Sequence, residues 1–335
     1  MGDSEALIVV RTPNWLGDTV LALPALRALR VARPAARLSL IGRWAPLLAG
    51  QGAADVLLAY PRGFAERRRF ARAIRGERPD LAVLLPNSFE AAAAAWRWGA
   101  NRRLGFDTDL RRPLLTDPVP MPSPRPHQAD EYAALLAGLD VAVTDATPRW
   151  TLPEDAAAER EVTELLVGAG VGSGAPLVGL HLGAAFGSSK LWPVEAFGNL
   201  AARLAAGGLQ PLLLGSAADA ATAAGVLNAA GLPVASLVGR DRPMLLARLL
   251  ARLGCLVSGD TGVAHLAAAL SVATVTLFGP TDPALTAPRS VKAQILEGRV
   301  PCAPCFLPVC PIDHGCLRGL LPEAVEACVR RAVRA

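Results

Sequence analysis

The sequence predicts an α/β protein made of two doubly wound domains, each built on a parallel sheet. Its 335 residues are more than a single hydrophobic core usually organises, so two domains are expected. Hydrophobic residues make up 52% of the chain and charged residues 19%, which is typical of an ordered globular protein. Short apolar runs alternate with helix-like segments, the pattern of parallel strands joined by crossover helices.

In the first half of the chain, short runs rich in Val, Ile and Leu have the length of buried strands. These runs are Ala6–Arg11, Arg37–Ile41, Val56–Ala59 and Leu81–Leu85. Segments with helical periodicity are expected at Ala25–Ala32, Ala65–Arg75, Phe89–Arg97, Ala129–Gly138 and Glu154–Gly168. Prolines interrupt the pattern between residues 113 and 126, and the glycine-rich segment 170–176 predicts the domain boundary.

The second half of the chain repeats this alternation. Strands are expected at Leu177–Leu182, Gln210–Leu214, Val234–Leu237, Cys255–Ser258 and Val272–Phe278. Helices are expected at Val194–Ala206, Ala217–Ala230, Pro243–Arg252, Val263–Leu270 and Pro322–Ala332. We therefore expect a first domain over residues 1–170, a second over residues 171–320, and a C-terminal helix within residues 321–335 that returns to brace the first domain. Such sheets bind ligands at the carboxyl ends of their strands, here in a cleft between the two domains.

Composition also bears on location and partners. No run of 18 or more uncharged apolar residues appears, so no membrane span is expected. Two acidic residues precede the first apolar run, which is atypical of a secretory signal, so we expect a cytoplasmic protein. Arginines outnumber acidic residues over residues 1–130. This excess suits an anionic partner such as phosphorylated lipid or nucleic acid, or it reflects a GC-rich genome that encodes arginine freely.

The first candidate loop, Thr12–Thr19, directly follows the first expected strand. Gly17 permits a tight turn, and Asp18 stands where the next helix begins. Asp18 or Thr19 is either an ordinary helix cap or part of a catalytic site. Pro24 weakens the cap interpretation, because proline is best tolerated in the first turn of a helix.

The second candidate loop, Gly183–Pro193, contains one of only two lysines among the 34 basic residues of the chain, Lys190 and Lys292. The chain otherwise uses arginine for its basic residues. A lysine in a Gly/Ser loop at a strand end therefore indicates a compact ammonium group that binds a phosphate. The alternative is a solvated surface lysine.

The third candidate loop, Ser258–His265, passes from a strand into a helix. Asp260, Thr261 and Gly262 open that helix, whose free N–H groups and dipole favour an anion. The alternative is that Asp260 is an N-cap and His265 packs in the core. The sequence contains no GxxxxGK[ST] motif, no GxGxxG after the first strand and no paired acidic motif for a metal–diphosphate.

Six cysteines are unevenly placed, with Cys255 and Cys328 apart from a cluster of four. The cluster has the spacing C-x2-C-x4-C-x5-C and comprises Cys302, Cys305, Cys310 and Cys316. Three alternatives stay open: a structural zinc site, reduced cysteines that pack, and disulfides. The first pair has zinc-knuckle spacing, but the second pair is too widely spaced for the usual ribbon pattern. In each case we assign the cluster to stability, because none of it lies in a predicted donor-site loop.

Several extended motifs resemble glycosyltransferase family 9, the ADP-heptose:lipopolysaccharide heptosyltransferases of GT-B fold. The motifs are NWLGDTVLALPALRALR (14–30), LLPNSF (84–89), HLGAAFGSSKLWPVEAF (181–197), LLLGSAAD (212–219), SGDTGVAHLAAAL (258–270) and LFGPTDP (277–283). The resemblance runs nearly end to end, and the WLGD and LPNSF forms look most similar to the heptosyltransferase II branch.

The resemblance implies a role for each candidate residue. By position, Asp18 matches the general base, Lys190 the lysine on the donor diphosphate, and Asp260 the carboxylate that holds sugar hydroxyls. Further donor-binding positions are Thr261, Gly262, His265, Gly183 and Asp219. Asp219 is the weaker candidate for the ribose or adenine, because Ala217 stands where some members have an acid. Positions on the acceptor side are Asn14, Trp15, Gly17, Asn87 and Ser88.

The implied reaction is an inverting transfer of heptose from ADP-heptose to the lipopolysaccharide core, without a cofactor or a divalent metal. The implied partners are the nucleotide-sugar donor, the core acceptor and the anionic inner-membrane surface, and no nucleic acid. Two alternatives stay open: a relative that transfers a different NDP-sugar, and a nucleotide-sugar-binding protein without activity. The presence of Asp18 favours an enzyme.

Overall fold

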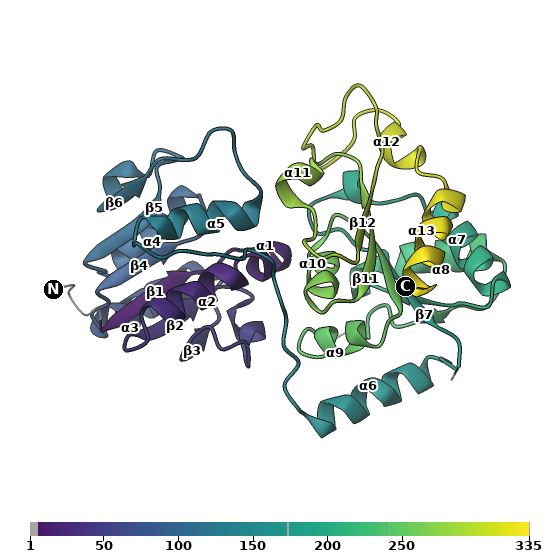
Figure 1. Ribbon diagram of the computed structural model, residues 1–335, viewed down its shortest axis with the longest axis horizontal. Coiled ribbons are helices and arrows are strands. Elements are labelled where there is room, and N and C mark those ends of the chain that lie inside the picture. The colour runs from purple at the N-terminus through teal and green to yellow at the C-terminus, as the bar shows by residue number, and fades with distance from the viewer. Residues whose placement is uncertain (1–5, 173, 241, 335) are drawn as a thin grey trace. The chain divides into compact units, whose positions relative to one another are not determined.

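The computed structural model describes residues 6–172, 174–240 and 242–334. The chain divides into two compact units, Met1–Arg149 and Trp150–Ala335 (Figure 1). Each unit contains one six-stranded sheet whose described strand pairs are all parallel, with helices packed on it. The predicted fold class of two doubly wound α/β domains is therefore confirmed.

The sheet of the first unit has the strand order β3-β2-β1-β4-β5-β6. Its strands are β1 (Leu7–Arg11), β2 (Arg37–Ile41), β3 (Val56–Leu58), β4 (Leu81–Leu84), β5 (Arg102–Phe106) and β6 (Asp117–Val119). The central strand β1 pairs with both β2 and β4 and is buried at every residue, as expected for a run of Leu, Ile and Val covered on two faces. The direction of winding changes at β1, so ligands are expected at its carboxyl end.

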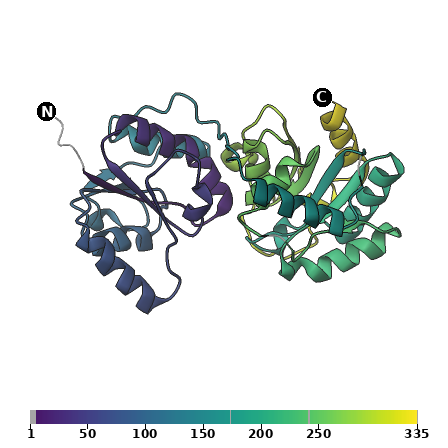
Figure 2. The same ribbon diagram turned by 90° about the horizontal axis from the view of Figure 1, so that it is seen from below.

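Helices of the first unit lie on opposite faces of its sheet (Figure 2). They are α1 (Leu16–Leu21), α2 (Leu23–Ala32), α3 (Phe64–Gly76), α4 (Phe89–Arg97) and α5 (Gln128–Ala137), with 3₁₀ turns η1 (Ala45–Leu48) and η2 (Arg112–Leu114). On one face Ile74 of α3 and Trp98 after α4 join Val9 and Leu84 in a buried cluster. On the other face α5 packs against α1 and α2.

Two features of this unit differ from the sequence prediction. Strands β5 and β6 were not expected, because β5 begins with Arg102 and Arg103 and only its last three residues are buried. The first helical region is also divided: α1 ends at Leu21, and α2 begins at Leu23 with Pro24 in its first turn. Proline is tolerated there because the first N–H groups of a helix have no intrahelical acceptor.

The sheet of the second unit has the strand order β12-β11-β10-β7-β8-β9. Its strands are β7 (Leu177–His181), β8 (Gln210–Leu214), β9 (Ala235–Ser236), β10 (Cys255–Gly259), β11 (Ala273–Phe278) and β12 (Ala293–Glu297). The sequence did not predict β12. This strand pairs with β11, and none of its five residues is fully buried.

The helices of the second unit complete its doubly wound layers. They are α6 (Ala156–Gly168), α7 (Val194–Ala206), α8 (Ala220–Ala230), α9 (Leu246–Ala251), α10 (Gly262–Ala269), α11 (Pro283–Thr286), α12 (Gly315–Arg318) and α13 (Pro322–Arg334), with 3₁₀ turns η3 (Ser188–Lys190) and η4 (Ala217–Asp219). One face is covered by α7, α8 and α13, whose apolar side chains form one core with Leu180 and Val257. Helix α10 packs on β10, β11 and α9.

The boundary between the units lies at Arg149/Trp150, about twenty residues before the predicted boundary at 170/171. Helix α6 belongs to the second unit because it packs on α9. There Glu159 pairs with Arg248 (2.7 Å) and Arg252 (2.9 Å). The predicted glycine-rich linker thus lies inside the second unit, and its residue 173 falls outside the described residues.

The C-terminal helix does not follow the prediction either. Helix α13 packs on α7, β10 and β11 of the second unit, where Val325, Cys328 and Val329 are buried in the core. Arg203 of α7 donates to Glu326 of α13 at 2.7 Å. The structure therefore assigns this helix to the core of the second unit, whereas the sequence analysis expected it to brace the first domain. Separately, none of the helices in the described part of the chain has the length and apolar character needed to span a bilayer.

Candidate functional site

Two groups of candidate residues lie at the carboxyl ends of the two sheets, one group in each unit. In the first unit Asp18 stands in the first turn of α1, directly after β1. The N-cap residue of α1 is Trp15, and the Thr19 hydroxyl donates back to the Trp15 carbonyl at 2.9 Å. The interpretation of Asp18 or Thr19 as the cap is therefore wrong. Burial and, after it, the Asp18 carboxylate raise the pKa of Tyr132, which places Asp18 beside α5.

Arg11 fixes the loop that leads to Asp18. This arginine ends β1 with only 2% of its surface exposed, and burial lowers its pKa. Its guanidinium donates to the Thr12 carbonyl (2.7 Å) and to Asn14 Oδ1 (2.7 Å) and lies 4.3 Å from the centre of the Tyr60 ring. A buried charge is tolerated only where such partners replace water. Asn14 is thus held in place, while the Trp15 indole beside it is half exposed.

The loop after β4 carries two further candidates, and both have structural partners. Asn87 donates to Glu131 Oε1 (2.7 Å) and accepts from Arg111 (3.2 Å). Ser88 is the N-cap of α4 and accepts from the Ala91 N–H (3.3 Å). Gly17 is buried in α1. The structure therefore brings the candidate acceptor-side residues to one sheet edge, where hydrogen bonds of Asn14, Asn87 and Ser88 stabilise the loops.

Sequence reasoning missed three buried charges of this half-site: Arg11, Arg111 and Glu131. Arg111 donates to the carbonyls of Phe106 (2.8 Å) and Pro86, and burial lowers its pKa to about 10. Glu131 is fully buried and pairs with Arg125 at 2.6 Å. Arg11 was visible as a charge at the end of an apolar run. Arg111 and Glu131 carry no comparable signal, because neither stands in an apolar run and each also bonds to the distant loop after β4.

In the second unit an ion pair joins two of the candidate loops. Lys190, at the end of η3, places its Nζ 2.5 Å from Asp260 Oδ2 and 3.2 Å from the Asp260 carbonyl. The two side chains are only 12% and 7% exposed. The ammonium also lies 4.8 Å from the centre of the Phe186 ring. The alternative of a solvated surface lysine is therefore wrong.

Asp260 has further neighbours. The Thr281 hydroxyl donates to Asp260 Oδ2 at 2.8 Å, and His265 Nε2 of α10 lies 3.9 Å from Asp260 Oδ1. The N-cap of α10 is Thr261, not Asp260, and the Thr261 hydroxyl pairs with Ser258 Oγ at 2.8 Å. His265 is buried, as expected if it packs in the core, but its ring faces the Asp260 carboxylate. Thr281 belongs to the LFGPTDP segment, to which the sequence analysis gave no role.

Gly183 and Asp219 lie against each other at the ends of β7 and β8. A Cβ atom on Gly183 would stand 2.7 Å from Asp219 Oδ2, so a side chain here would displace the Asp219 carboxylate. Asp219 Oδ2 accepts from the Ser216 N–H and hydroxyl, both at 2.8 Å. His181, which sequence reasoning did not single out, ends β7 with its Nδ1 3.5 Å from Ser258 Oγ. Burial lowers the pKa of His181 to about 4 against the opposing effect of Asp219, so the ring is neutral at pH 7.

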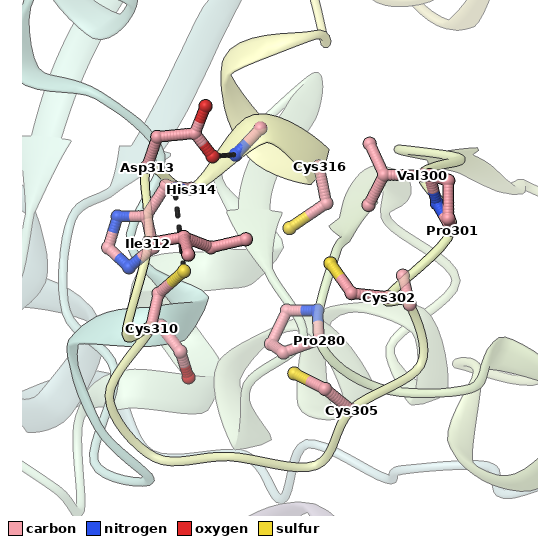
Figure 3. A pocket seen from close by; sticks show the side chains of 13 residues that line it. Pro280, Val300, Pro301, Cys302, Cys305, Cys310, Ile312, Asp313, His314 and Cys316 are labelled. Atoms are coloured by element: carbon pink, nitrogen blue, oxygen red, sulfur yellow. Dashed lines mark hydrogen bonds between the residues drawn. The ribbon is translucent and has the colours of Figure 1, made fainter.

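The clustered cysteines line one cavity of about 320 Å³ in the second unit (Figure 3). All six cysteines of the chain are free thiols: Cys255, Cys316 and Cys328 are buried, Cys302 is exposed, and Cys305 and Cys310 are half buried. Among the described residues, no three His, Cys, Asp or Glu side chains are arranged to hold a metal ion. Within the cluster, the packing alternative fits the buried Cys316 and not the exposed Cys302, and the zinc alternative stays a prediction.

The arrangement at the second sheet suits a negatively charged nucleotide. A buried lysine, a carboxylate and the start of a helix meet where two parallel strands end, and helix N-termini attract anions through their N–H groups and dipole. The first sheet offers a carboxylate in the equivalent loop. Two such units define the class of GT-B glycosyltransferases, which pair an acceptor-binding with a nucleotide-sugar-binding domain.

Comparisons with known proteins specify the family. The model of glycosyltransferase family 9 (heptosyltransferase) matches residues 67–315, and the chain belongs to this family. It is 30% identical, over 87% of each chain, to lipopolysaccharide heptosyltransferase 2 of Salmonella typhimurium. The solved structure of the E. coli ADP-heptose lipopolysaccharide heptosyltransferase II aligns with a TM-score of 0.81 and 26% identity over 98% of both chains. A family 9 structure from Veillonella parvula aligns with a TM-score of 0.83 and 22% identity over 98% of this chain and 97% of that one, which supports the fold alone.

Proposed function

We propose that this enzyme transfers heptose from ADP-heptose to the inner core of lipopolysaccharide with inversion at the anomeric carbon. Family membership and the names of the relatives support this substrate pair. The observation that carries the proposal is the buried Lys190–Asp260 pair beside the N-terminus of α10.

The donor is proposed to bind at the second sheet. Lys190 and the first turn of α10, with Thr261, Gly262 and His265, stabilise the charge that develops on the departing diphosphate. Asp260 accepts hydrogen bonds from the sugar hydroxyls. Asp219 contacts the ribose or adenine, and the absence of a side chain on Gly183 leaves room for it.

The acceptor is proposed to bind at the first sheet. Its hydroxyl oxygen forms the new bond to the anomeric carbon while the bond from that carbon to the ADP oxygen breaks. The electron pair leaves with ADP, and Asp18 takes the hydroxyl proton as general base. The half-exposed Trp15 contacts the acceptor, while Asn14, Gly17, Asn87 and Ser88 shape the loops around it.

No divalent cation is proposed to take part, because an ammonium and a helix N-terminus already face the diphosphate. Turnover should therefore be the same in EDTA and in added Mg²⁺. A rate that depends on the cation would contradict this part of the proposal.

The enzyme is further proposed to work in the cytoplasm, at the anionic surface of the inner membrane. Arg68, Arg69, Arg72 and Arg75 of α3 are exposed and suit such a surface. By contrast, Arg67 is turned toward Tyr60, 5.0 Å from the ring centre, so the five arginines of this helix do not form one face.

A donor panel tests the proposed substrate. Purified enzyme is incubated with lipopolysaccharide core acceptor and ADP-heptose, ADP-glucose, GDP-mannose or UDP-glucose, and products are identified by mass. The expected product has one added heptose and forms from ADP-heptose. Transfer of a different sugar would favour the alternative of another NDP-sugar. ADP binding without any transfer would favour the non-catalytic alternative.

A further inference from the structure

The cysteine loop, defined as residues 298–316, connects β12 to α12 and is hydrogen-bonded to two segments of the proposed donor site. On one side the Pro280 carbonyl accepts the N–H groups of Cys305 (3.0 Å) and Phe306 (2.8 Å). On the other side Ser189 donates its N–H to the Pro308 carbonyl (3.1 Å) and its hydroxyl to the Leu307 carbonyl (2.6 Å). The cysteine loop, whose cysteines were assigned to stability from the sequence, is therefore hydrogen-bonded to the segments that carry Lys190 and Thr281.

Each of these two anchor points adjoins a charged residue of the donor site. Ser189 precedes Lys190 and is only 2% exposed. The fit is close, since a Cβ atom on Gly187, whose φ is +153°, would stand 2.1 Å from the Pro308 carbonyl oxygen. Pro280 precedes Thr281, whose hydroxyl donates to Asp260. Ser189 and Pro280 also line the cysteine cavity. Pro280 is seen beside the cysteines in Figure 3.

The hydrogen bonds around Asp260 indicate what Thr281 does. Asp260 Oδ2 accepts from both Lys190 (2.5 Å) and Thr281 (2.8 Å), and both partners are largely shielded from water. If the lysine turns toward a diphosphate, the Thr281 hydroxyl still holds the carboxylate in one orientation. A carboxylate without that partner would be free to rotate, and its alignment with a sugar would have to be established at each binding event.

We propose that Thr281 and Ser189 are positioning residues of the donor site: Thr281 orients the Asp260 carboxylate toward the sugar, and Ser189 fixes the loop that presents Lys190. The cysteine loop anchors both. This inference rests on the proposed function, in which Asp260 contacts the sugar and Lys190 the diphosphate.

Variants of Thr281 and Ser189 should differ in their effects on ADP binding and on turnover. Thr281→Val keeps the shape and removes the hydroxyl. We expect ADP affinity within about twofold of wild type, but a rise of roughly tenfold in KM for ADP-heptose or an equal fall in kcat, because one hydrogen bond to a charged group is lost. Thr281→Ser restores the hydroxyl and should recover activity to within about threefold.

Ser189→Ala should act on the nucleotide instead. We expect ADP and ADP-heptose to bind roughly five- to tenfold more weakly by calorimetry. The kcat at saturating donor should fall as well, because Lys190 also stabilises the charge that develops on the departing diphosphate. Ser188→Ala is the matched control, because Ser188 is the exposed neighbour in the same turn, and its ADP affinity should equal that of wild type.

Thermal unfolding of every variant separates positioning from folding. The proposal is overturned if Thr281→Val weakens ADP and ADP-heptose equally, if Thr281→Ser fails to restore turnover, or if Ser189→Ala behaves like Ser188→Ala. A separate measurement tests the proposed function itself: if Lys190→Ala binds ADP as tightly as wild type, Lys190 does not contact the donor diphosphate.

Discussion

The Lys190–Asp260 pair is largely removed from water, and for such pairs the lost hydration of two charges can exceed their mutual attraction. A buried ion pair is therefore weak support for a stabilising role. The proposed function gives the pair a different role, in which Lys190 binds the donor diphosphate while the Thr281 hydroxyl holds the Asp260 carboxylate. The chain's bias toward arginine made this lysine visible from sequence, whereas its pairing with Asp260 joins positions 70 residues apart.

Lys190→Ala should weaken ADP binding by about 1.5–3 kcal/mol, because a charge-assisted contact to the diphosphate is lost. Isothermal calorimetry measures this directly. Lys292→Ala is the matched control: Lys292 is the other lysine of the chain, it is exposed, and its removal should leave ADP affinity unchanged. Equal ADP affinity of both variants would show that Lys190 does not contact the nucleotide.

Asp18→Asn should lower the chemical rate by roughly 10²–10⁴-fold, because the amide retains the size of the carboxylate and cannot accept the proton. ADP affinity should change little. Single-turnover kinetics isolate the chemical step, and Asp140→Asn serves as control, since Asp140 is exposed and its positive φ of 55° is one that asparagine adopts readily. Turnover near the wild-type rate would remove Asp18 from the mechanism.

His181 should make the protein sensitive to acid. Its pKa is about 4 in the fold, below the ordinary value of 6.5, so the unfolded chain binds the proton first. The free energy of unfolding should then fall as the pH drops from about 6.5 toward 4, by up to about 1.4 kcal/mol per pH unit from this group. Urea unfolding measured across this pH range should show that the free energy of unfolding depends less steeply on pH in His181→Gln than in wild type. Parallel curves for the two proteins would contradict the assignment.

At the scale of elements, the sequence located the buried parallel strands and the loops that follow them. Strands such as β1 and β10 are continuous apolar runs, and their carboxyl ends must meet at one edge of a parallel sheet. The sequence did not predict which of the two units α6 and α13 pack in. Helical periodicity shows which face of a helix is apolar, but not which sheet that face covers. The apolar signal is weak in the other three strands: β5 begins with two arginines, β6 has only three residues, and β12 has only two large apolar residues between polar ones.

Helix α3 should bind anionic membranes through its exposed arginines. The double variant Arg68→Glu/Arg72→Glu reverses two charges one turn apart and should weaken binding to phosphatidylglycerol vesicles. Wild-type binding should itself weaken as salt rises past about 0.1 M, where the screening length is about 10 Å. Vesicle sedimentation is the measurement, with Arg160→Glu/Arg334→Glu, also exposed, as the charge-matched control. Binding that is independent of salt, or equal in both double variants, would exclude this role for α3.

At the scale of the whole molecule, each unit contributes one chemically distinct group of residues. The first unit holds its candidate base beside α5, and the second holds a lysine and a helix start suited to an anion. The sequence identified both groups because each lies in a loop after a strand. It did not identify the residues that hold these loops, Arg111, Glu131, Ser189 and Thr281, because each acts through partners far away in the chain.

The six cysteines allow a test on the intact protein. Protein purified without added metal should contain no stoichiometric zinc by elemental analysis, and six thiols should react in denaturant. Under native conditions Cys302 should react first because it is exposed, Cys305 and Cys310 more slowly, and the buried Cys255, Cys316 and Cys328 last. For Cys255, burial also raises the pKa of the thiol to about 12, which leaves almost no reactive thiolate at pH 7.

Near-stoichiometric zinc, lost together with thermal stability on chelation, would instead establish the four clustered thiols as a structural metal site. Fewer than six titratable thiols in metal-free, denatured protein would indicate disulfides.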